Sequence, residues 1–190
     1  MNNNYGLVYP NEGDYYDVNI TNSNFSKIAD EIDEIKSGGL KREIVVASYD
    51  TVNPYKEAAD FVCNESNGSN ILKVAVESCC EGGMILLLDG SYYLDSTVEV
   101  NKSITICGYG SATKIIQGNE FTGYALIKLK KANTTIREVS MADSVTSNRA
   151  VHLICVDALS ASIGNCEFSI NRSHIIFLIS SVHTKLTITY

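Results

Sequence analysis

Short clusters of apolar and β-branched residues recur along the second half of the chain, and their spacing constrains the fold most. After Gly118 no helical periodicity remains, and strand-like clusters follow: YALIKL, TTIREVSM, AVHLICV, ASIGNCEFSI, HIIFLI and KLTITY. Two tracks of apolar residues keep the spacing: Ile127, Val151 and Ile175 in steps of 24, and Ile136, Ile163 and Leu186 in steps of 27 and 23. A period in the low twenties with several short strands per period predicts a β-solenoid, in which one coil stacks on the next.

The apolar run Met84–Leu88 predicts the first buried strand of this solenoid. Five residues are too few to span a bilayer, which takes about 20, and the glycines on either side leave no room for a helix. We expect Gly90 to lie at a corner. Ile85 and Leu87 should share one face, whereas Leu86 should contact the other side. Period-two segments at 97–100, 104–106 and 114–116 predict further short strands.

An amphipathic helix is predicted directly before this strand, at residues 69–80. Ser69 or Asn70 can cap its start, and Gly82-Gly83 stops it. Its apolar stripe comprises Ile71, Leu72, Ala75, Val76, Cys79 and Cys80. A stack of coils would expose strand edges and core at its end, so we predict that this helix caps the first coil. A short strand is predicted before the helix, at residues 43–50.

The segment 1–39 is expected to form a separate N-terminal arm. Residues 1–23 are polar and aromatic without a sustained period, which predicts an irregular segment. From Asn24 onward, steps of three and four between apolar residues predict an amphipathic helix that ends at Gly38-Gly39. The apolar stripe of this helix is narrow and the helix has only about three turns, so it needs a packing partner to be stable in water. The helix either packs on the following domain or associates with its own copies, for example as a short trimeric bundle.

Charge and composition exclude several classes of partner. The 15 Lys and Arg against 22 Asp and Glu give a net charge of −7, so a nucleic-acid backbone would be repelled. The N-terminus has neither a basic start nor an apolar stretch, so we expect no signal peptide and no membrane insertion. The six cysteines, several of them inside apolar patterns, are interpreted as reduced and mostly buried thiols. Their spacing does not predict a metal site, and we expect no cofactor.

The region from the predicted helix to the first strands resembles a known family. ILKVAVES, followed by GGMILLLDGSYYLDSTVEVNKSITICGYGSATKII, is similar to the start of right-handed parallel β-helix proteins of the pectate-lyase-like superfamily. The matching residues are Gly82, Gly83, Ile85, Leu87, Gly90, Tyr92, Val98, Val100, Ile104, Ile106, Gly108, Gly110 and Thr113. The resemblance implies an all-β fold, a right-handed parallel β-helix with an N-terminal capping helix and a preceding helical arm.

The segment 1–36 resembles a different group. YGLVYPNEGDYYDVNITNSNFSKIADEIDEI is similar to the N-terminal segment of tail-associated structural proteins of phages and prophages of Gram-positive bacteria. The resemblance implies a tail fibre or tailspike-type protein of the virion tail, present in the bacterial cytoplasm before assembly. Its expected partners are other virion or tail proteins through the arm, its own copies in a homotrimer, and a glycan of the host surface.

Three segments are therefore expected: the arm at 1–39, a strand and capping helix at 40–83, and β-helix coils at 84–190. The last cluster, KLTITY, ends inside a strand pattern. We interpret this end either as a truncation or as a surface that another chain covers.

Two classes of function remain open on this fold: a structural or host-attachment protein that binds carbohydrate, and a polysaccharide hydrolase or lyase. A glycosidase needs two carboxylates about 5–9.5 Å apart, and Glu138 and Glu167, near comparable places in successive coils, are the candidate catalytic pair. A glycan-binding surface needs exposed aromatic rings beside hydrogen-bonding amides. The candidate residues for it are Tyr92, Tyr93, Tyr109 and Tyr124, with Gln117 and Asn119 between them.

Overall fold

The computed structural model describes residues 24–25, 40–144, 150–178 and 185–189. The chain divides into two units, Met1–Leu40 and Lys41–Tyr190. In the first unit Asn24 and Phe25 are helical, where the amphipathic helix was predicted to begin. The rest of that predicted helix, the irregular segment before it and the end of the arm lie outside the described residues.

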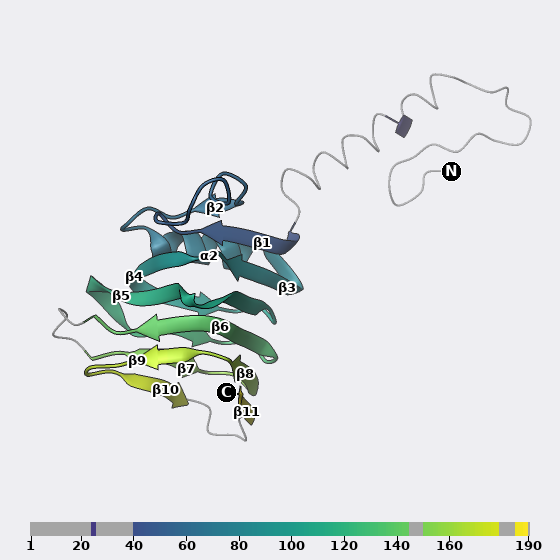
Figure 1. Cartoon of the computed structure of the whole chain (residues 1–190). Helices are drawn as coiled ribbons and strands as arrows, with labels where there is room; N and C mark the ends of the chain where they lie inside the picture. Colours follow the sequence, from purple (N-terminus) through teal and green to yellow (C-terminus); the bar gives the residue numbers. More distant parts are fainter. Residues whose placement is uncertain (1–23, 26–39, 145–149, 179–184, 190) are drawn as a thin grey trace, which may run out of the picture. The chain divides into compact units, whose positions relative to one another are not determined.

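The second unit is built mostly of β-strands, all of which pair in parallel in the described registers (Figure 1). Its one described helix is α2 (Gly68–Ser78). The strands are β1 (Lys41–Ala47), β2 (Phe61–Val62), β3 (Cys79–Leu87), β4 (Gly90–Val100), β5 (Thr105–Leu129), β6 (Thr134–Ala142), β7 (His152–Val156), β8 (Ser160–Gly164), β9 (Glu167–Ser169), β10 (His174–Leu178) and β11 (Lys185–Thr189). The prediction of an all-β chain with a short helix is confirmed at this level.

The strand pairs follow three tracks. Track 1 joins β1, β3, the start of β5, the first half of β6, β8 and β11. Track 2 joins the first half of β4, the middle of β5, the second half of β6, and β9. Track 3 joins the second half of β4, the end of β5, β7 and β10. The long strands β4, β5 and β6 therefore each contribute to more than one track.

A ladder of isoleucines runs along track 1. Each residue is the register partner of the next, in the order Ile44, Ile85, Ile106, Ile136, Ile163 and Ile188. The first five are at most 4% exposed. Full burial of one such side chain stabilises a fold by roughly 1.5–3 kcal/mol. β-Branched side chains stack well on a pleated surface, so one residue type can occupy this position in strand after strand.

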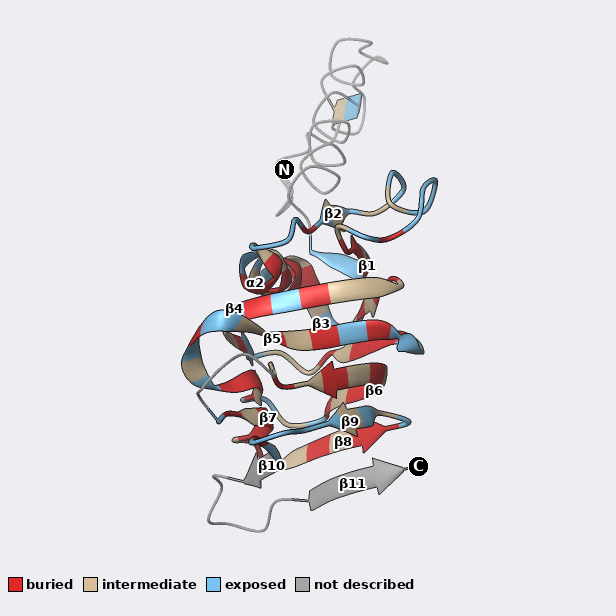
Figure 2. Cartoon of the chain, turned by 60° about the vertical axis from the view of Figure 1, so that its left-hand side comes forward, coloured by how far each residue is buried: buried red, intermediate tan, exposed pale blue. Residues whose placement is uncertain are grey.

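Tracks 2 and 3 carry their own apolar ladders. Track 2 aligns Tyr92, Ile115, Met141 and Phe168. Track 3 aligns Val98, Ile127 and Ile154, all fully buried. Buried and exposed residues alternate along the strands, which is visible as bands on β4 and β5 in Figure 2. The three ladders together form the core of the second unit.

The predicted spacing is correct for one pair of strands and wrong for others. Ile136 and Ile163 are register partners, as predicted. Ile127, however, pairs with Ile154 rather than Val151, and the next residue on that track is Ile176 rather than Ile175. Ile163 pairs with Ile188 rather than with Leu186. The steps on track 1 are also unequal, because the step from Ile85 to Ile106 is shorter than the next one, from Ile106 to Ile136. The segments between the tracks vary in length, so no fixed period describes the chain.

The apolar run at 84–88 behaves as predicted. Ile85 and Leu87 are fully buried, while Leu86 between them is half-buried on the other side. Gly90 lies where β3 gives way to β4, with φ of +127°, a backbone conformation that only glycine adopts readily. A Cβ atom at this position would lie 2.4 Å from the Asp50 carboxylate.

The helix differs from its prediction at both ends. It ends at Ser78 because Cys79 is already extended, with ψ of 138°, and pairs with Lys41 of β1. The glycine pair at 82–83 therefore lies inside β3 and does not stop the helix. Asn67 is the N-cap residue, and its side chain makes no capping bond. The hydroxyl of Ser69, one predicted cap, instead donates to Ser96 O at 3.0 Å and accepts from Asp95 N at 2.9 Å.

Helix α2 packs mainly on β4 and also touches β1 and β3. Its buried face includes Leu72, Ala75 and Val76, spaced by three and four residues. Gly68 permits close approach at the first turn, because a Cβ there would lie 2.4 Å from Tyr93 O. The predicted strand at 43–50 is observed at Lys41–Ala47. No described helix is long and apolar enough to cross a membrane.

Candidate functional site

Tyr92, one of the predicted glycan-binding residues, belongs to the core. Its side chain is fully buried, and its hydroxyl lies 2.8 Å from Val46 O and 3.0 Å from Leu88 O. Burial raises the pKa of this phenol above its usual value. The structure therefore places Tyr92 in the core and not on the surface: Tyr92 begins the ladder of track 2, and strand alternation points its ring inward.

Tyr93, the next residue, points outward for the same reason and lines an open groove of about 890 Å³. We call this the β4–β5 groove. Its lining residues are Tyr49, Glu65, Ser66, Tyr93, Leu94, Asp95, Ile116, Gln117, Gly118, Asn119, Glu120, Asp143 and Ser144. They come from the segments that follow β1 and precede α2, from β4 and β5, and from the segment after β6. The groove thus crosses neighbouring strands at the ends of track 2.

Two aromatic rings stand together at one side of the groove. The ring centroids of Tyr49 and Tyr93 are 6.4 Å apart, and the ring planes are inclined by 36°. This lies within the range of favourable aromatic contacts. The pKa of Tyr49 is raised by desolvation first and then by the negative charges of Asp50 and Glu65, among others. Tyr49 was not predicted, because it lies far from Tyr93 in the sequence and outside the strand pattern.

Hydrogen bonds hold the amide side chains of the groove in place. Gln117 is 1% exposed, and its Oε1 accepts from Ser144 N at 3.2 Å. Ser144 Oγ donates to Asn119 Oδ1 at 3.0 Å. The segment after β6 therefore positions two amides that belong to β5. Both amides were noted in the sequence beside the candidate tyrosines, and the structure places them in the same groove as Tyr93.

Asp143 is the most strongly held acidic side chain of the groove. It is 5% exposed, and its carboxylate accepts from Arg172 N at 2.8 Å, Asn171 N at 2.9 Å, Asn171 Nδ2 at 2.9 Å and Ser173 N at 3.0 Å. Burial alone would raise its pKa, but the hydrogen bonds from Arg172, Asn171 and Ser173 outweigh burial and lower the pKa to about 2. Asp143 is therefore ionised at neutral pH and joins the end of β6 to the segment before β10.

Asp95 on β4 is also held in its ionised form. Its pKa is lowered chiefly by a hydrogen bond with Ser69; burial opposes this shift, and Ser96 and the nearby Lys73 reinforce it. Glu65 and Glu120 add two exposed carboxylates to the lining. Among the described residues that line the groove there is no Lys, Arg or His. The site is therefore polar and negatively charged, with an aromatic pair on one side.

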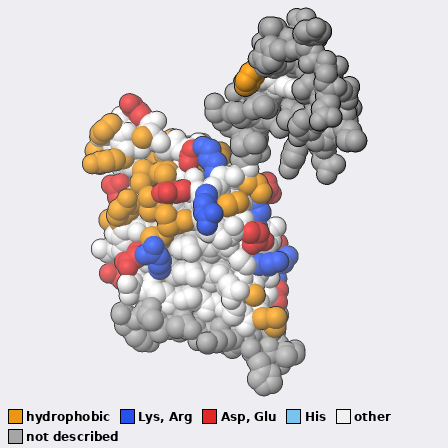
Figure 3. Space-filling view, turned by 90° about the vertical axis from the view of Figure 1, so that its right-hand side faces the viewer, with side chains coloured by type: hydrophobic (Ala, Val, Ile, Leu, Met, Phe, Trp, Pro, Cys, Tyr) orange, Lys and Arg blue, Asp and Glu red, His pale blue; other side chains and the backbone are white. Residues whose placement is uncertain are grey.

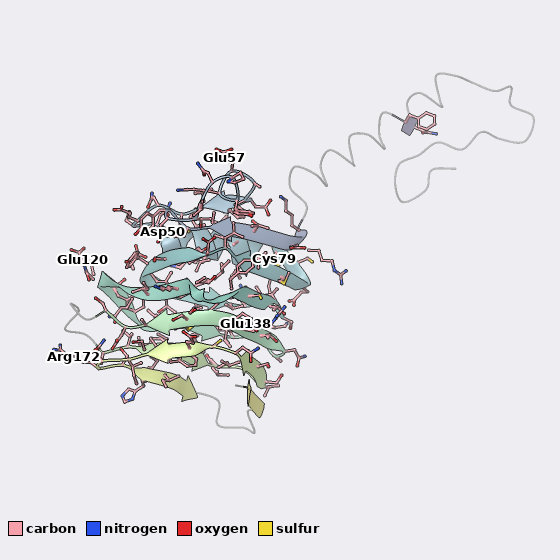
Figure 4. All side chains as sticks on the ribbon, viewed as in Figure 1. Asp50, Glu57, Cys79, Glu120, Glu138 and Arg172 are labelled. Atoms are coloured by element: carbon pink, nitrogen blue, oxygen red, sulfur yellow. The ribbon has the colours of Figure 1, made fainter. Side chains whose placement is uncertain are left out.

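The candidate catalytic pair is two positions out of register. Glu138 accepts a hydrogen bond from Asn165 Nδ2 at 2.7 Å, whereas Glu167 is the register partner of Ser140. Glu138 has φ of +55° at the bend between tracks 1 and 2 of β6. It lies on the opposite side of the unit from Glu120 of the groove (Figure 4). The structure therefore does not align Glu138 and Glu167 as neighbours on adjacent strands, as the sequence interpretation had assumed.

Tyr109 and Tyr124 lie outside the lining of the groove. Tyr109 is 57% exposed at the bend in β5 between tracks 1 and 2. Tyr124 is 42% exposed; Lys128 Nζ lies 5.7 Å from its ring centroid, and Cys155 Sγ lies 3.9 Å from its hydroxyl. Of the four predicted tyrosines, the structure therefore brings Tyr93 alone to the groove.

The acidic residues of the groove were missed, although the sequence carries a signal for them. Each of three track-2 segments ends in a short polar cluster: Asp95-Ser96 after β4's first half, Gln117–Glu120 in β5, and Asp143-Ser144 after β6. Because parallel strands in register end at the same edge, these clusters must meet. The sequence alone does not show which strands are paired, so it does not show that these clusters lie together.

The cysteines form no disulfide and no metal centre in the described part of the chain. All six are free thiols, and the described residues contain no group of three or more His, Cys, Asp or Glu able to hold a metal ion. Burial raises the pKa of Cys63 to about 12. These thiols serve as small apolar side chains in and around the core.

Comparison with protein-family models found no match for this chain. Searches of curated proteins and of solved structures likewise found none.

Proposed function

We propose that residues 41–190 form a right-handed parallel β-helix capped by α2. Three parallel tracks with continuous ladders support this proposal, as does the strong preference of parallel crossover connections for the right hand. Cysteines introduced at the register partners Thr135 and Ser162 should then crosslink on oxidation. A pair at Thr135 and Ser140, within one strand, serves as the control that should not.

The function that the geometry supports best is binding of a carbohydrate in the β4–β5 groove. The observation that carries it is the Tyr49–Tyr93 pair beside fixed hydrogen-bonding side chains. Aromatic faces pack on the C–H faces of a sugar ring, while carboxylates and amides accept hydrogen bonds from its hydroxyl groups. An open groove suits a chain of sugars, which enters from the side and extends beyond the site.

In this proposal, carbohydrate binding attaches a virion tail to the host surface. The support is the resemblance of the segment 1–36 to tail-associated structural proteins. In this proposal the first unit joins other tail proteins or two further copies of the chain, and the second unit presents the groove. The mass of the intact chain in solution tests the homotrimer, and a strict monomer would contradict it.

Polysaccharide cleavage is less well supported than binding. A glycosidase needs a carboxylic acid whose pKa is raised so that it still holds a proton at working pH. Asp95 and Asp143 have lowered pKa values, and Glu138 and Glu167 are out of register. Release of reducing ends from bound polysaccharide would reinstate the enzymatic alternative.

Binding of the intact chain to a broad array of glycans tests the proposed function. Tyr93→Ala should weaken binding at least about tenfold, as loss of a central aromatic contact commonly does. Tyr109→Ala is the matched control, because it removes a more exposed tyrosine outside the groove. The proposal fails if no glycan binds, or if both substitutions weaken binding equally.

A further inference from the structure

The β4–β5 groove differs from the rest of the described surface in how its charges are balanced. Some carboxylates outside the groove lie beside lysines: Asp157 is 2.9 Å from Lys128, and Glu99 is 3.1 Å from Lys130. On the face shown in Figure 3, acidic and basic side chains are interspersed. The charged side chains among the described lining residues are all acidic; the nearest lysines stand beside the lining, Lys73 near Asp95 and Lys56 with its Nζ donating to Tyr49 O.

Several carboxylates lie near the aromatic pair. Glu65 is close enough to Tyr49 to raise the pKa of its phenol, and Asp50, directly beside it, acts in the same direction. Asp95 lies two positions from Tyr93 on the same face of β4. A sugar ring that stacks on these tyrosines therefore lies close to several carboxylates.

We infer that the groove selects glycans without negative charge and rejects acidic ones, such as chains of uronic acids. This inference rests on the proposed function and adds the class of ligand to it. Neutral sugar hydroxyl groups can donate hydrogen bonds to the carboxylates of Glu65, Asp95 and Glu120, and a neutral sugar needs no cation to offset a charge of its own. Repulsion between a uronate and one of these carboxylates about 4 Å away would lower the affinity about fivefold, even at the dielectric constant of water.

The length of the groove bounds the size of the bound segment. One part of its lining comes from β4, from β5 and from the segment after β6, which are successive neighbours in track 2, and Tyr49, Glu65 and Ser66 extend the lining beyond this part. Adjacent strands are about 4.8 Å apart, so this part of the groove alone crosses roughly 10 Å of the stack. This length holds a short oligosaccharide, with the rest of the polysaccharide outside.

A matched pair of ligands tests the inference directly. β-1,4-Manno-oligosaccharides and β-1,4-mannuronate oligosaccharides differ only in the oxidation state of C6, and both are placed on the array used above with other neutral, amine-bearing and acidic glycans. We expect the binders to be neutral or amine-bearing. Any residual affinity for acidic chains should rise with salt, because salt screens the repulsion.

Reversing one charge completes the test. Glu120→Lys should improve binding of acidic glycans about tenfold or more, since it removes a repulsion and adds an attraction. Glu57→Lys makes the same change of charge at an exposed site outside the groove and should leave selectivity unchanged. Both residues are labelled in Figure 4.

The outcomes separate the two proposals. Binding confined to acidic glycans would overturn the inference and leave carbohydrate binding in place, as would equal effects of the two lysine substitutions. Absence of any glycan binder would overturn both. Both proposals are supported if Tyr93→Ala abolishes the binding of neutral glycans and if Glu120→Lys, but not Glu57→Lys, improves the binding of acidic glycans.

Discussion

Replacing Asp143 with asparagine should destabilise the second unit, by an amount that depends on pH. In the folded chain the pKa of this carboxyl group is about 2, against an ordinary value of 3.8. Each unit of difference corresponds to about 1.36 kcal/mol, so the ionised carboxylate contributes about 2.5 kcal/mol at neutral pH. Asparagine keeps the size of the side chain but offers one oxygen, and its amide group faces N–H donors.

The direction of the pH dependence follows from the lowered pKa. The stabilisation is fully present above the unfolded pKa, near 4, and is lost as pH falls toward the folded pKa, near 2. At pH 3 about half of it should remain. The difference in unfolding free energy between wild type and Asp143→Asn should therefore shrink between pH 4 and pH 2, whereas above pH 5 it should stay constant.

Urea denaturation of the intact chain at a series of pH values measures this difference. Glu57→Gln, which neutralises an exposed carboxylate, is the control and should change stability by less than about 0.5 kcal/mol. A difference below about 0.5 kcal/mol at pH 7 for Asp143→Asn would refute the reasoning. A difference that does not change down to pH 2.5 would show that the charge is not the cause.

Four substitutions and one chemical modification probe the core and the bends. Ile136→Ala should lower the free energy of unfolding by about 3 kcal/mol and Ile136→Val by about 1 kcal/mol, because this rung of the ladder is fully buried; equal effects in urea denaturation would contradict this. Gly90→Ala should cost more than about 2 kcal/mol, because its φ of +127° and the close Asp50 carboxylate both oppose a Cβ. Gly110→Ala, with φ of +63° and open space around it, should cost only about 1 kcal/mol. A lower melting temperature for Gly110→Ala than for Gly90→Ala would refute the argument. Iodoacetamide at pH 8 should modify the half-buried Cys80 before Cys63, which is 3% exposed and has a pKa of about 12; mass spectrometry of the native chain measures the order of modification.

Features of the fold that depend on residues close together in the chain could be predicted from the sequence. The alternation at 84–88 follows from the period of a strand, and the corner at Gly90 follows from its freedom to adopt positive φ. The end of α2 was harder to place. Cys79 and Cys80 continue the apolar stripe of the helix, but pairing of Cys79 with Lys41 draws them into β3, and tertiary pairing outweighs helical periodicity here.

The candidate site depended on information that a single sequence does not hold. Adjacent tyrosines such as Tyr92 and Tyr93 look alike, and only the register determines which of them enters the core. The groove is assembled from segments as distant in the sequence as those of Tyr49 and Ser144. A small error in register, such as Ile127 with Val151 in place of Ile154, is enough to hide that these segments meet.

The isoleucine ladder stabilises the core of the second unit, whereas the connections between its rungs form much of the surface. The connection between successive rungs is shortest from Ile85 to Ile106 and longest from Ile44 to Ile85, where it includes α2. Lengthening such a connection costs little entropy and leaves the rungs in place. Loops between the tracks can therefore lengthen or change sequence while the ladder continues to set the stability of the stack.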